Sequence, residues 1–311
     1  MSTTRIYVMM VFTALFWSGA FITGKLAIRE FPAFSLTFFR FLFALPFIFA
    51  VLYWKERPHF FPNRKAWPSL ILLGVMCTFL YHALFFSALQ YTTAMNASLL
   101  GATNPMVTAL LACLFFREKL GLLQVTGIVL SFSGVVLIVT DGGALFTSGL
   151  EVNPGDFLMF AAVSSWAVYA LVSRKVMLLY KLSPLMMTAY TFLVCTIFAI
   201  PFVGWENPAV YWQGITFGGW LSVLYMAVFA SVLGYLFQMM AIQQIGAPRT
   251  AIFMNLVPVF TVIQSMLILG ESFSLLKAVS TFLILIGVYF ATRPAKDSMP
   301  ILVAVNSKNV R

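Results

Sequence analysis

The stretch NPMVTALLACLFFREKL (104–120) has a second copy of its pattern 153 residues further along the chain, VPVFTVIQSMLILGESF (257–273). In each copy, a proline near the start of an apolar run is followed thirteen residues later by a glutamate. The pairs are Pro105 with Glu118 and Pro258 with Glu271. Apolar composition aligns leucines by chance, but it does not readily align a proline and a glutamate at the same spacing. The chain therefore contains an internal repeat.

The repeat extends well beyond these two stretches. A shift of 153 superposes residues 67–140 on 220–293 without a gap, and it aligns tryptophan, glutamine, proline and glutamate with themselves. The part that precedes it matches at a shift of 149, where Trp17 falls on Trp166. We therefore predict a first repeat over 5–140 and a second over 156–294.

The composition is that of an integral membrane protein. Of the 311 residues, 61% are apolar and 9% are charged, whereas soluble domains are about half apolar and a quarter charged. Apolar runs of about 20 residues cross a bilayer as helices, and a barrel strand would instead alternate. The runs are approximately 7–28, 33–54, 68–89, 94–116, 122–140, 156–174, 184–204, 218–240, 248–269 and 275–292. The predicted fold class is an all-α integral membrane protein with ten transmembrane helices.

The net charge of +10 reflects orientation in the membrane. If the N-terminus is cytoplasmic, fifteen of the nineteen Lys and Arg residues fall on cytoplasmic segments or the tail, as the positive-inside rule predicts. Both termini are then cytoplasmic, 141–155 is an outer linker and 295–311 is a flexible cytoplasmic tail. The placement favours contact with the lipid bilayer over nucleic-acid binding, and it predicts a multi-pass protein of the cell (inner) membrane.

Each repeat contains five predicted helices, and an odd number inserts the second repeat upside down relative to the first. Inverted repeats are typical of secondary transporters, whose substrate site lies between the halves near the midplane of the bilayer. The sequence therefore predicts two inverted repeats that rock around a central site and expose it to each side in turn.

Five stretches, in their order and spacing, resemble a known family. They are FWSGAFITGKLAI (16–28), FFRFLFALP (38–46), ALQYTTAMNASLLGATNPMVTALLACLFFREKL (88–120), GIVLSFSGVVLIV (127–139) and GYLFQMMAIQQIGAPRTAIFMNLVPVFTVIQSMLILGE (234–271). With them the chain resembles the drug/metabolite transporter (DMT) superfamily, specifically the EamA-type exporters, over about 5–294. The resemblance implies export of amino acids or other small metabolites, through a cavity lined mainly by helices 1, 3, 4, 6, 8 and 9.

Acidic residues are absent from the middle of the predicted helices. Small multidrug relatives in this superfamily carry a glutamate in the middle of the first helix, whereas here that stretch reads FTALFWSGAF (12–21). A bare organic cation would usually need a buried carboxylate, because an unpaired buried charge is costly. We therefore expect a neutral, zwitterionic or anionic small molecule, with a neutral or zwitterionic metabolite favoured, although a cage of aromatic rings could hold a cation.

Aromatic and polar side chains within the predicted helices are the candidates for the cavity lining, because polar groups are costly in lipid. The predicted substrate-binding residues are Trp17, Lys25, Tyr81, His82, Asn96, Asn104, Trp166, Tyr235, Gln238 and Asn255, and the predicted gating kinks are Pro105 and Pro258. A snorkelling side chain is the alternative for Lys25. A packed histidine and a proton relay are both open for His82. Arg40 is expected to be structural, because its helix is expected to be peripheral.

Other classes of function fit the sequence less well. Metalloprotease and serine-hydrolase motifs are missing, as are paired carboxylates within a helix, so we predict no enzyme, no metal site and no cofactor. The P-loop that binds ATP is missing too, so the energy for transport must come from a gradient. A channel or a non-transporting receptor is a distant alternative, since no filter motif is present. A multidrug exporter and a sugar-phosphate or nucleotide-sugar carrier remain open.

Overall fold

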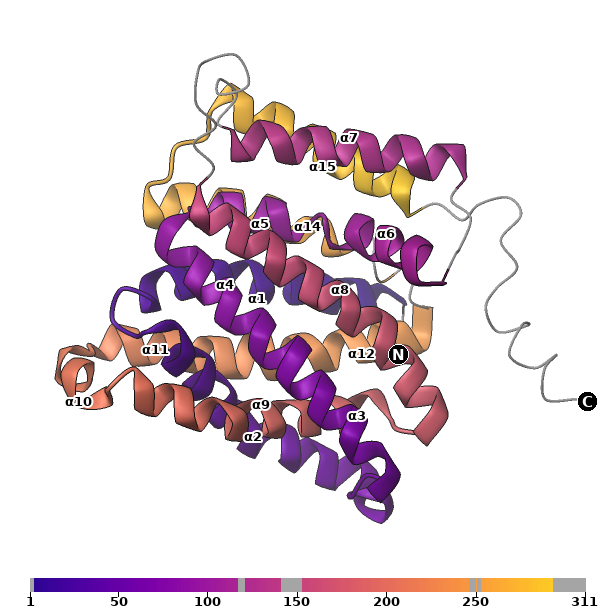
Figure 1. Ribbon diagram of the computed structural model, residues 1–311, viewed down its shortest axis with the longest axis vertical. Helices are drawn as coiled ribbons and strands as arrows, with labels where there is room; N and C mark the ends of the chain where they lie inside the picture. The colour runs from indigo at the N-terminus through magenta and orange to yellow at the C-terminus, as the bar shows by residue number, and fades with distance from the viewer. Residues whose placement is uncertain (1–2, 117–120, 141–152, 246–249, 251–252, 293–311) are drawn as a thin grey trace, which may run out of the picture.

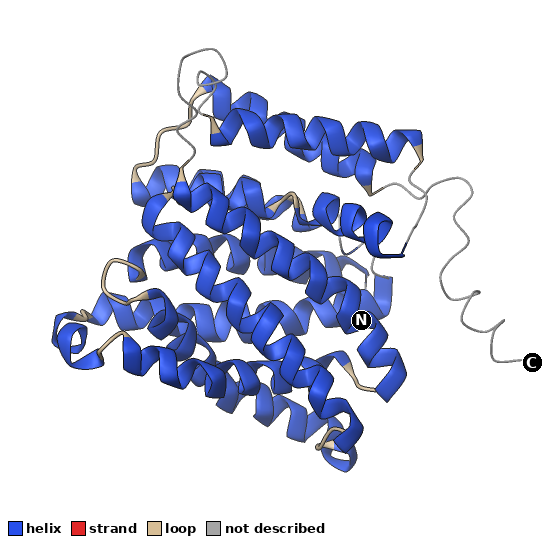
Figure 2. Cartoon of the chain, in the orientation of Figure 1, coloured by secondary structure: helices blue, strands red, loops and turns tan. Residues whose placement is uncertain are grey.

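The structure, a computed structural model, describes residues 3–116, 121–140, 153–245, 250 and 253–292. Every regular element in these ranges is a helix, and the helices lie side by side in layers (Figures 1 and 2). Most of the predicted linker, Glu118 and the predicted tail fall outside the described residues. The α-helices are α1 (Thr3–Ala27), α2 (Ala33–Glu56), α3 (Trp67–Leu72), α4 (Leu80–Tyr91), α5 (Ala94–Gly101), α6 (Asn104–Phe116), α7 (Leu122–Val139), α8 (Pro154–Tyr180), α9 (Pro184–Trp205), α10 (Pro208–Tyr211), α11 (Phe217–Tyr225), α12 (Gly234–Ile245), α14 (Leu256–Gln264) and α15 (Leu275–Ala291), and the π-helical stretches are η3 (Leu73–Phe79), η5 (Met226–Leu233) and η6 (Ser265–Leu269).

Eight helical spans are long and apolar enough to cross a membrane. They are Thr3–Ala27, Ala33–His59, Arg64–Tyr91, Ala94–Phe115, Leu122–Val139, Pro154–Tyr180, Pro184–Trp205 and Phe217–Ile242. Two shorter apolar helices, Leu256–Leu269 and Leu275–Ala291, coincide with the last two predicted runs. The all-helical membrane fold is therefore confirmed, and the count of ten crossings stays a prediction.

Hydroxyl side chains fix where several helices begin. Thr93, Ser183, Thr216 and Ser274 precede α5, α9, α11 and α15, and each accepts the backbone N–H of the residue three positions later. Such a cap satisfies one of the N–H groups that has no partner within the helix. The first turn of a helix also tolerates proline, because the N–H group that proline lacks would have no partner within the helix. Proline begins both α8 and α9.

Two of the π-helical stretches occupy equivalent places in the sequence repeat. η5 begins 153 residues after η3, which is the shift that superposes the two repeats. A π turn interrupts the regular ladder of hydrogen bonds, and such turns are frequent at functional sites. The carbonyl of Ala230 in η5 accepts a hydrogen bond from Trp17 Nε1 at 2.9 Å, and that of Met76 in η3 accepts one from Ser165 Oγ at 2.6 Å.

Helices that are equivalent in the two repeats pack together in opposite directions. Glu206, after α9, accepts hydrogen bonds from the backbone N–H groups of Phe34 and Ser35 at the start of α2, at 3.0 and 2.7 Å. Glu56, which ends α2, accepts a hydrogen bond of 2.7 Å from the hydroxyl of Ser183, before α9. Each helix therefore ends where its partner begins, so α2 and α9 are antiparallel.

Glycines bring α7 and α15 into backbone contact. A Cβ added at Gly127 would lie 2.5 Å from the carbonyl oxygen of Gly287, and one added at Gly134 would lie 2.8 Å from that of Ser280. No other residue type fits at such a distance without a shift of the backbone. The residue numbers of the contacts rise along α7, from 127 to 134, while they fall along α15, from 287 to 280. This pair of helices is therefore antiparallel as well.

The first helix of each repeat packs mainly across the other repeat. α1 contacts α11, η5, α12 and α14, and α8 contacts η3, α4, α5 and α6. These two helices therefore lie between the halves and position the candidate site. The structure also corrects one expectation, because α2 is not peripheral: it packs against α4, α9 and η5, which bears directly on Arg40.

Pro105 and Pro258 do not kink continuous helices. α5 ends at Gly101 and α6 begins at Asn104, so Pro105 is the second residue of a new helix. Pro258 is likewise the third residue of α14. Both prolines lie in a first turn, where the missing N–H would have had no helical partner. The predicted kink is thus a break between helices, and its gating role stays a prediction.

Candidate substrate site

Trp17 on α1 and Trp166 on α8 both contact the ring of one tyrosine. The ring centroid of Tyr235, on α12, is 5.6 Å from that of Trp17 and 6.4 Å from that of Trp166. Trp166 also lies 5.0 Å from Tyr81 and 5.0 Å from Tyr169. We call these five residues the aromatic cluster. Four of them are residues that the sequence predicts to bind substrate, and they come from both repeats.

His82 packs beside the aromatic cluster. Its ring meets Tyr81 and Phe41 edge to face, with both centroid distances at 4.7 Å. Its Nδ1 lies 2.8 Å from the carbonyl oxygen of Thr78. Because that oxygen can only accept, Nδ1 carries the proton in this arrangement. The geometry favours a packed, hydrogen-bonded histidine, one of the two roles that the sequence leaves open.

Arg40 on α2 places a guanidinium among these rings. The side chain is 5% exposed, and its Nε donates a hydrogen bond of 2.9 Å to the hydroxyl of Ser231 in η5. Its Cζ lies 5.6 Å from the ring centroid of Phe41 and 6.0 Å from that of Phe86. Sequence reasoning missed this residue as a site candidate. The available signal was its position inside the apolar run FFRFLF (38–43).

The side chain of Lys25 binds the C-terminal end of α4. Its Nζ donates hydrogen bonds to the carbonyl oxygens of Leu89 and Thr92, at 2.5 and 2.7 Å. These carbonyls belong to the end of α4, where the last C=O groups have no partner within the helix and a cation is favourable. The geometry favours a helix-capping role for this lysine, and its predicted role in substrate binding stays untested.

The remaining predicted residues lie outside the aromatic cluster. Asn104 Oδ1 accepts a hydrogen bond of 3.3 Å from Thr108, and Gln238 Nε2 lies 3.7 Å from the sulfur of Met254. Asn255 directly precedes α14 and makes no capping hydrogen bond with its side chain. Asn96 Oδ1 is buried without a partner. Within the described residues, no hydrogen bond joins these four side chains to the cluster, so their role in binding stays a prediction.

The five acidic residues that the structure describes all lie at helix ends. Glu30 accepts the backbone N–H of Thr216 before α11, at 2.8 Å, and Glu271 accepts those of Ala94 and Met95 at the start of α5, at 2.7 and 3.0 Å. These carboxylates stabilise helix N-termini, where the free N–H groups favour negative charge. We call the end of the bundle that holds Glu30, Asp156, Glu206 and Glu271 the carboxylate end.

All four of these carboxylates join the two repeats at the carboxylate end, Glu30 through its contact with Thr216. Glu206 and Glu271, from the second repeat, cap α2 and α5 of the first. Asp156, at the start of α8, accepts a hydrogen bond of 2.5 Å from the hydroxyl of Thr92, after α4. Nearby, burial raises the pKa of Tyr211, whose hydroxyl donates to Ser35 Oγ at 2.7 Å. Away from the helix ends, the described residues place basic but no acidic groups inside the bundle.

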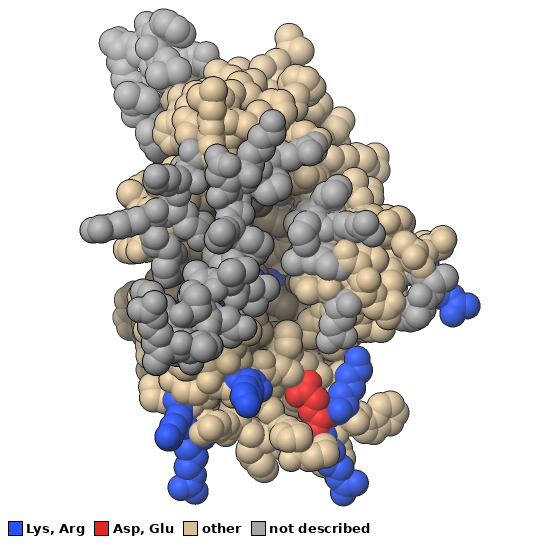
Figure 3. Space-filling model, turned by 90° about the vertical axis from the view of Figure 1, so that its right-hand side faces the viewer, with Lys and Arg blue, Asp and Glu red and all other residues tan. Residues whose placement is uncertain are grey.

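The opposite end of the bundle carries mainly basic groups among its charged side chains (Figure 3). This face is hollowed near its middle, and Lys or Arg atoms are visible within the hollow. Two open surface grooves, of about 580 and 370 Å³, lie beside η1 (Arg57–His59) and beside the start of α1. Neither groove is lined by a predicted site residue, so the aromatic cluster is the better candidate.

Comparison with known proteins identifies relatives along nearly the whole chain. The model of the EamA-like transporter family matches residues 4–140 and again 153–293. The uncharacterized transporter YyaM of Bacillus subtilis is 32% identical over 292 residues, which are 94% of this chain and 95% of that protein. An uncharacterized transporter of Archaeoglobus fulgidus is 34% identical over 292 residues, covering 93% and 98% of the two chains.

More distant similarities extend to a plant protein and a solved structure. A WAT1-related chloroplastic protein of Arabidopsis thaliana is 25% identical over 290 residues, 90% of this chain and 67% of that one. One crystal structure matches with a TM-score of 0.63 at 20% identity, covering 94% of this chain and 97% of the other. This last similarity supports the fold alone.

Proposed function

Because the chain belongs to the EamA-like transporter family, whose members are transporters and not enzymes, we propose that it exports amino acids or related small metabolites across the cell membrane. The observation that carries this proposal is the aromatic cluster, which combines Trp17 and Tyr81 of the first repeat with Trp166 and Tyr235 of the second. A site built from both halves is accessible from either side if the halves rock.

Two inverted five-helix repeats, with both termini cytoplasmic, are the topology we infer. The antiparallel packing of α2 with α9 and of α7 with α15 supports inversion, because each pair consists of equivalent helices. The two separate matches to one family model support the division into 5–140 and 156–294. The basic end in Figure 3 then faces the cytoplasm, as the positive-inside rule requires.

This topology has a direct test by cysteine labelling in a cysteine-free background. Arg64 lies at the basic end and Gly214 lies in the loop between α10 and α11. In right-side-out vesicles, a membrane-impermeant maleimide should label Gly214→Cys directly and Arg64→Cys only after lysis. The reverse pattern would contradict the inferred orientation.

The substrate we propose is an amphipathic metabolite without net positive charge, aromatic amino acids included. Large rings with few polar groups suit an apolar body. The carboxylates of the described residues all lie at helix ends, away from the aromatic cluster, where hydrogen bonds already engage them. Export by alternating access requires the carboxylate end to open, which means that Glu206 and Glu271 release the helices they cap. The energy comes from a gradient of the substrate or of an ion.

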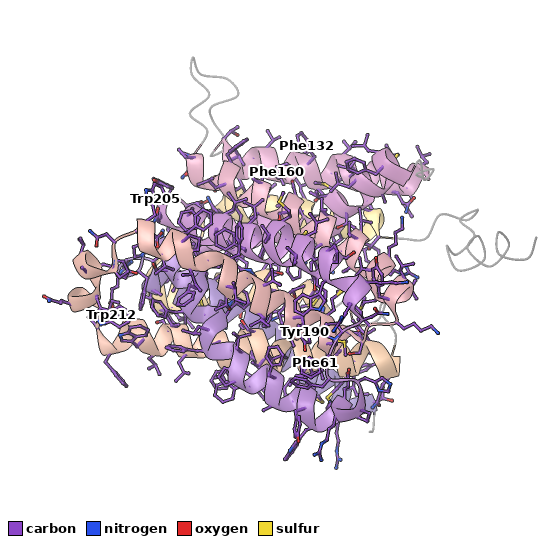
Figure 4. All side chains as sticks on the ribbon, turned by 60° about the horizontal axis from the view of Figure 1, so that its bottom comes forward. Phe61, Phe132, Phe160, Tyr190, Trp205 and Trp212 are labelled. Atoms are coloured by element: carbon purple, nitrogen blue, oxygen red, sulfur yellow. The ribbon has the colours of Figure 1, made fainter. Side chains whose placement is uncertain are left out.

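The function is tested by reconstituting the full chain in liposomes and measuring counterflow of a panel of amino acids. Uptake of one class is expected, and Trp166→Ala should abolish it. Phe132→Ala is the matched control, because Phe132 lies on the outside of the bundle on α7 and is 52% exposed (Figure 4). Absence of flux for every amino acid, from folded protein, would refute the amino-acid substrate and direct the panel to phosphorylated metabolites or drugs.

A further inference from the structure

We propose that the Arg40 guanidinium binds the carboxylate of the transported molecule, so that the substrate class is a monocarboxylate with an apolar or aromatic body. The inference rests on the proposed transport function, and it names the chemical group that the site recognises. Within the described residues, Arg40 uses only part of its hydrogen-bonding capacity.

Among the described residues, only one of the five N–H donors of Arg40 has an acceptor. Nε donates to Ser231 Oγ at 2.9 Å, and no described residue accepts from the two terminal amino groups, which carry the other four N–H donors. The enclosed side-chain polar atoms without a partner, among the described residues, are Asn96 Oδ1, Ser131 Oγ and Ser280 Oγ. The amino groups of Arg40 are not among them, so these groups are not completely enclosed by the protein.

The charge of Arg40 is not neutralised by the described chain. A guanidinium stays protonated in proteins, and a buried charge without a counter-ion is destabilising. The ionisable groups that affect it electrostatically are Tyr81, Tyr235 and Cys195, none of which is a carboxylate. The rings of Phe41 and Phe86, at 5.6 and 6.0 Å, offset part of this cost through cation–π attraction. Binding of an anion from outside the protein would offset the remaining cost of burying the charge.

The free donors of Arg40 favour a carboxylate. The two amino groups of a guanidinium lie in one plane and match the two oxygens of a carboxylate. A single cation balances one negative charge, which favours a monocarboxylate over a phosphate dianion. The aromatic cluster lies near it, because Phe41, whose ring centroid is 5.6 Å from Arg40 Cζ, contacts Phe192, and Phe192 in turn contacts Tyr235. An apolar body can therefore contact the rings while the carboxylate contacts Arg40.

Arg40 also breaks the symmetry between the two repeats. The helices α2 and α9 begin 151 residues apart, which places Thr191 opposite Arg40. Thr191 is buried and carries no charge. The site is thus positively charged on the side of the first repeat only. The carboxylate of the substrate would bind on that side, which sets the orientation of the substrate between two otherwise similar repeats.

The test uses one aromatic body with three head groups: 3-phenylpropionate, its neutral amide and phenyl phosphate. Each competes for counterflow of the amino acid that the wild-type chain transports, and for binding followed by tryptophan fluorescence. The variants are Arg40→Gln, which removes the charge, and Arg40→Lys, which keeps the charge without the planar fork. Arg64→Gln is the control, because it removes an exposed arginine.

The wild type should prefer the carboxylate to the amide at least tenfold, and Arg40→Gln should lose that preference while it still binds the amide. Arg40→Lys should be intermediate, and Arg64→Gln should match the wild type. Equal binding of carboxylate and amide by the wild type, or binding of neither, overturns the proposal without any variant. A preference for phenyl phosphate also overturns it. Flux of any panel compound supports the proposed transport function, whatever the effect of Arg40→Gln. If Arg40→Gln keeps the wild-type preference, only the role of Arg40 is refuted. A failure of the transport function and a failure of the Arg40 proposal are therefore distinguishable.

Discussion

The indole nitrogen of Trp17 donates a hydrogen bond of 2.9 Å to the carbonyl of Ala230, 213 positions away in the chain. The acceptor lies in η5, where a π turn interrupts the regular helical ladder. Ser165, next to Trp166 in the second repeat, bonds in the same way to Met76 in η3. The first helix of each half is thus hydrogen-bonded to the π-helical stretch of the other half.

Trp17→Phe should lower both stability and uptake while it keeps an aromatic ring. An unpaired buried carbonyl at Ala230 costs about 1–3 kcal/mol. Gly234→Ala should act similarly, because its Cβ would lie 2.6 Å from Trp17 Nε1. Thermal unfolding and counterflow measure both effects. Gly204→Ala is the control, since nothing lies within 4 Å of its Cβ. Unchanged stability in Trp17→Phe would show that the hydrogen bond is not needed.

Lys25→Met should reduce stability and leave substrate affinity unchanged. Lys25 Nζ donates to the carbonyls of Leu89 and Thr92, and a hydrogen bond from a charged donor contributes about 1.5–3 kcal/mol. The measurements are the midpoint of thermal unfolding and the KM for uptake, with the exposed Lys65→Met as control. A raised KM with unchanged stability would instead support the substrate-binding role that the sequence predicts.

The sequence predicts four members of the aromatic cluster as substrate-binding residues, and the structure brings these four together, while their role in binding stays a prediction. Apolar run length fixes the spanning helices, and the aligned Trp17 and Trp166 identify equivalent positions in the two halves. Tyr81 and Tyr235 follow from helices that the repeat superposes. These four residues were recognisable without coordinates, because the repeat itself indicates that both halves contribute to one site.

The sequence does not predict the partners of charged groups, because these depend on packing between distant segments. Arg40 was expected to be structural since α2 was expected at the periphery, but α2 packs against η5 and presents Arg40 to Ser231. Lys25 finds its acceptors 64 and 67 positions away. The positions of η3 and η5 cannot be predicted from the sequence either, because no residue type specifies a π turn. Only their shared shift of 153 relates them to the repeat.

A disulfide between Thr92→Cys and Asp156→Cys should block transport reversibly. The two side chains are joined by a hydrogen bond of 2.5 Å at the carboxylate end, and a Cβ at Gly155 would lie 2.6 Å from the Thr92 backbone nitrogen. The background lacks the free cysteines Cys77, Cys113 and Cys195. If this end must open, uptake should vanish on oxidation and return on reduction. Full uptake by fully cross-linked protein would show that these segments stay together during transport.

Gly287→Ala should destabilise the fold without changing substrate preference. Its Cβ would lie 2.3 Å from the backbone nitrogen of Ser131 and 2.6 Å from the carbonyl of Gly127, so α7 and α15 must separate. Overpacking of this kind costs about 1–3 kcal/mol. Gly218→Ala, whose Cβ would meet its nearest neighbour at 3.5 Å, is the matched control. Equal melting temperatures for the two variants would contradict the backbone contact between α7 and α15.

His82 offers a test of whether the chain couples transport to protons. Its Nδ1 faces the Thr78 carbonyl at 2.8 Å, and its ring is enclosed by Tyr81 and Phe41. The side-chain amide of His82→Asn can donate the same hydrogen bond but cannot take up a proton near neutral pH. We therefore expect His82→Asn to retain uptake, and His82→Phe, which lacks a donor, to lose stability.

The pH gradient across the liposome separates the two roles of His82. A packed histidine predicts that uptake by the wild type and by His82→Asn responds equally to an imposed gradient. A proton relay predicts that the gradient drives uptake by the wild type and not by His82→Asn, because the side chain of α4 that can change charge near neutral pH has been removed. Since the Thr78 hydrogen bond already occupies Nδ1, we expect the first result, with transport driven by the substrate gradient alone.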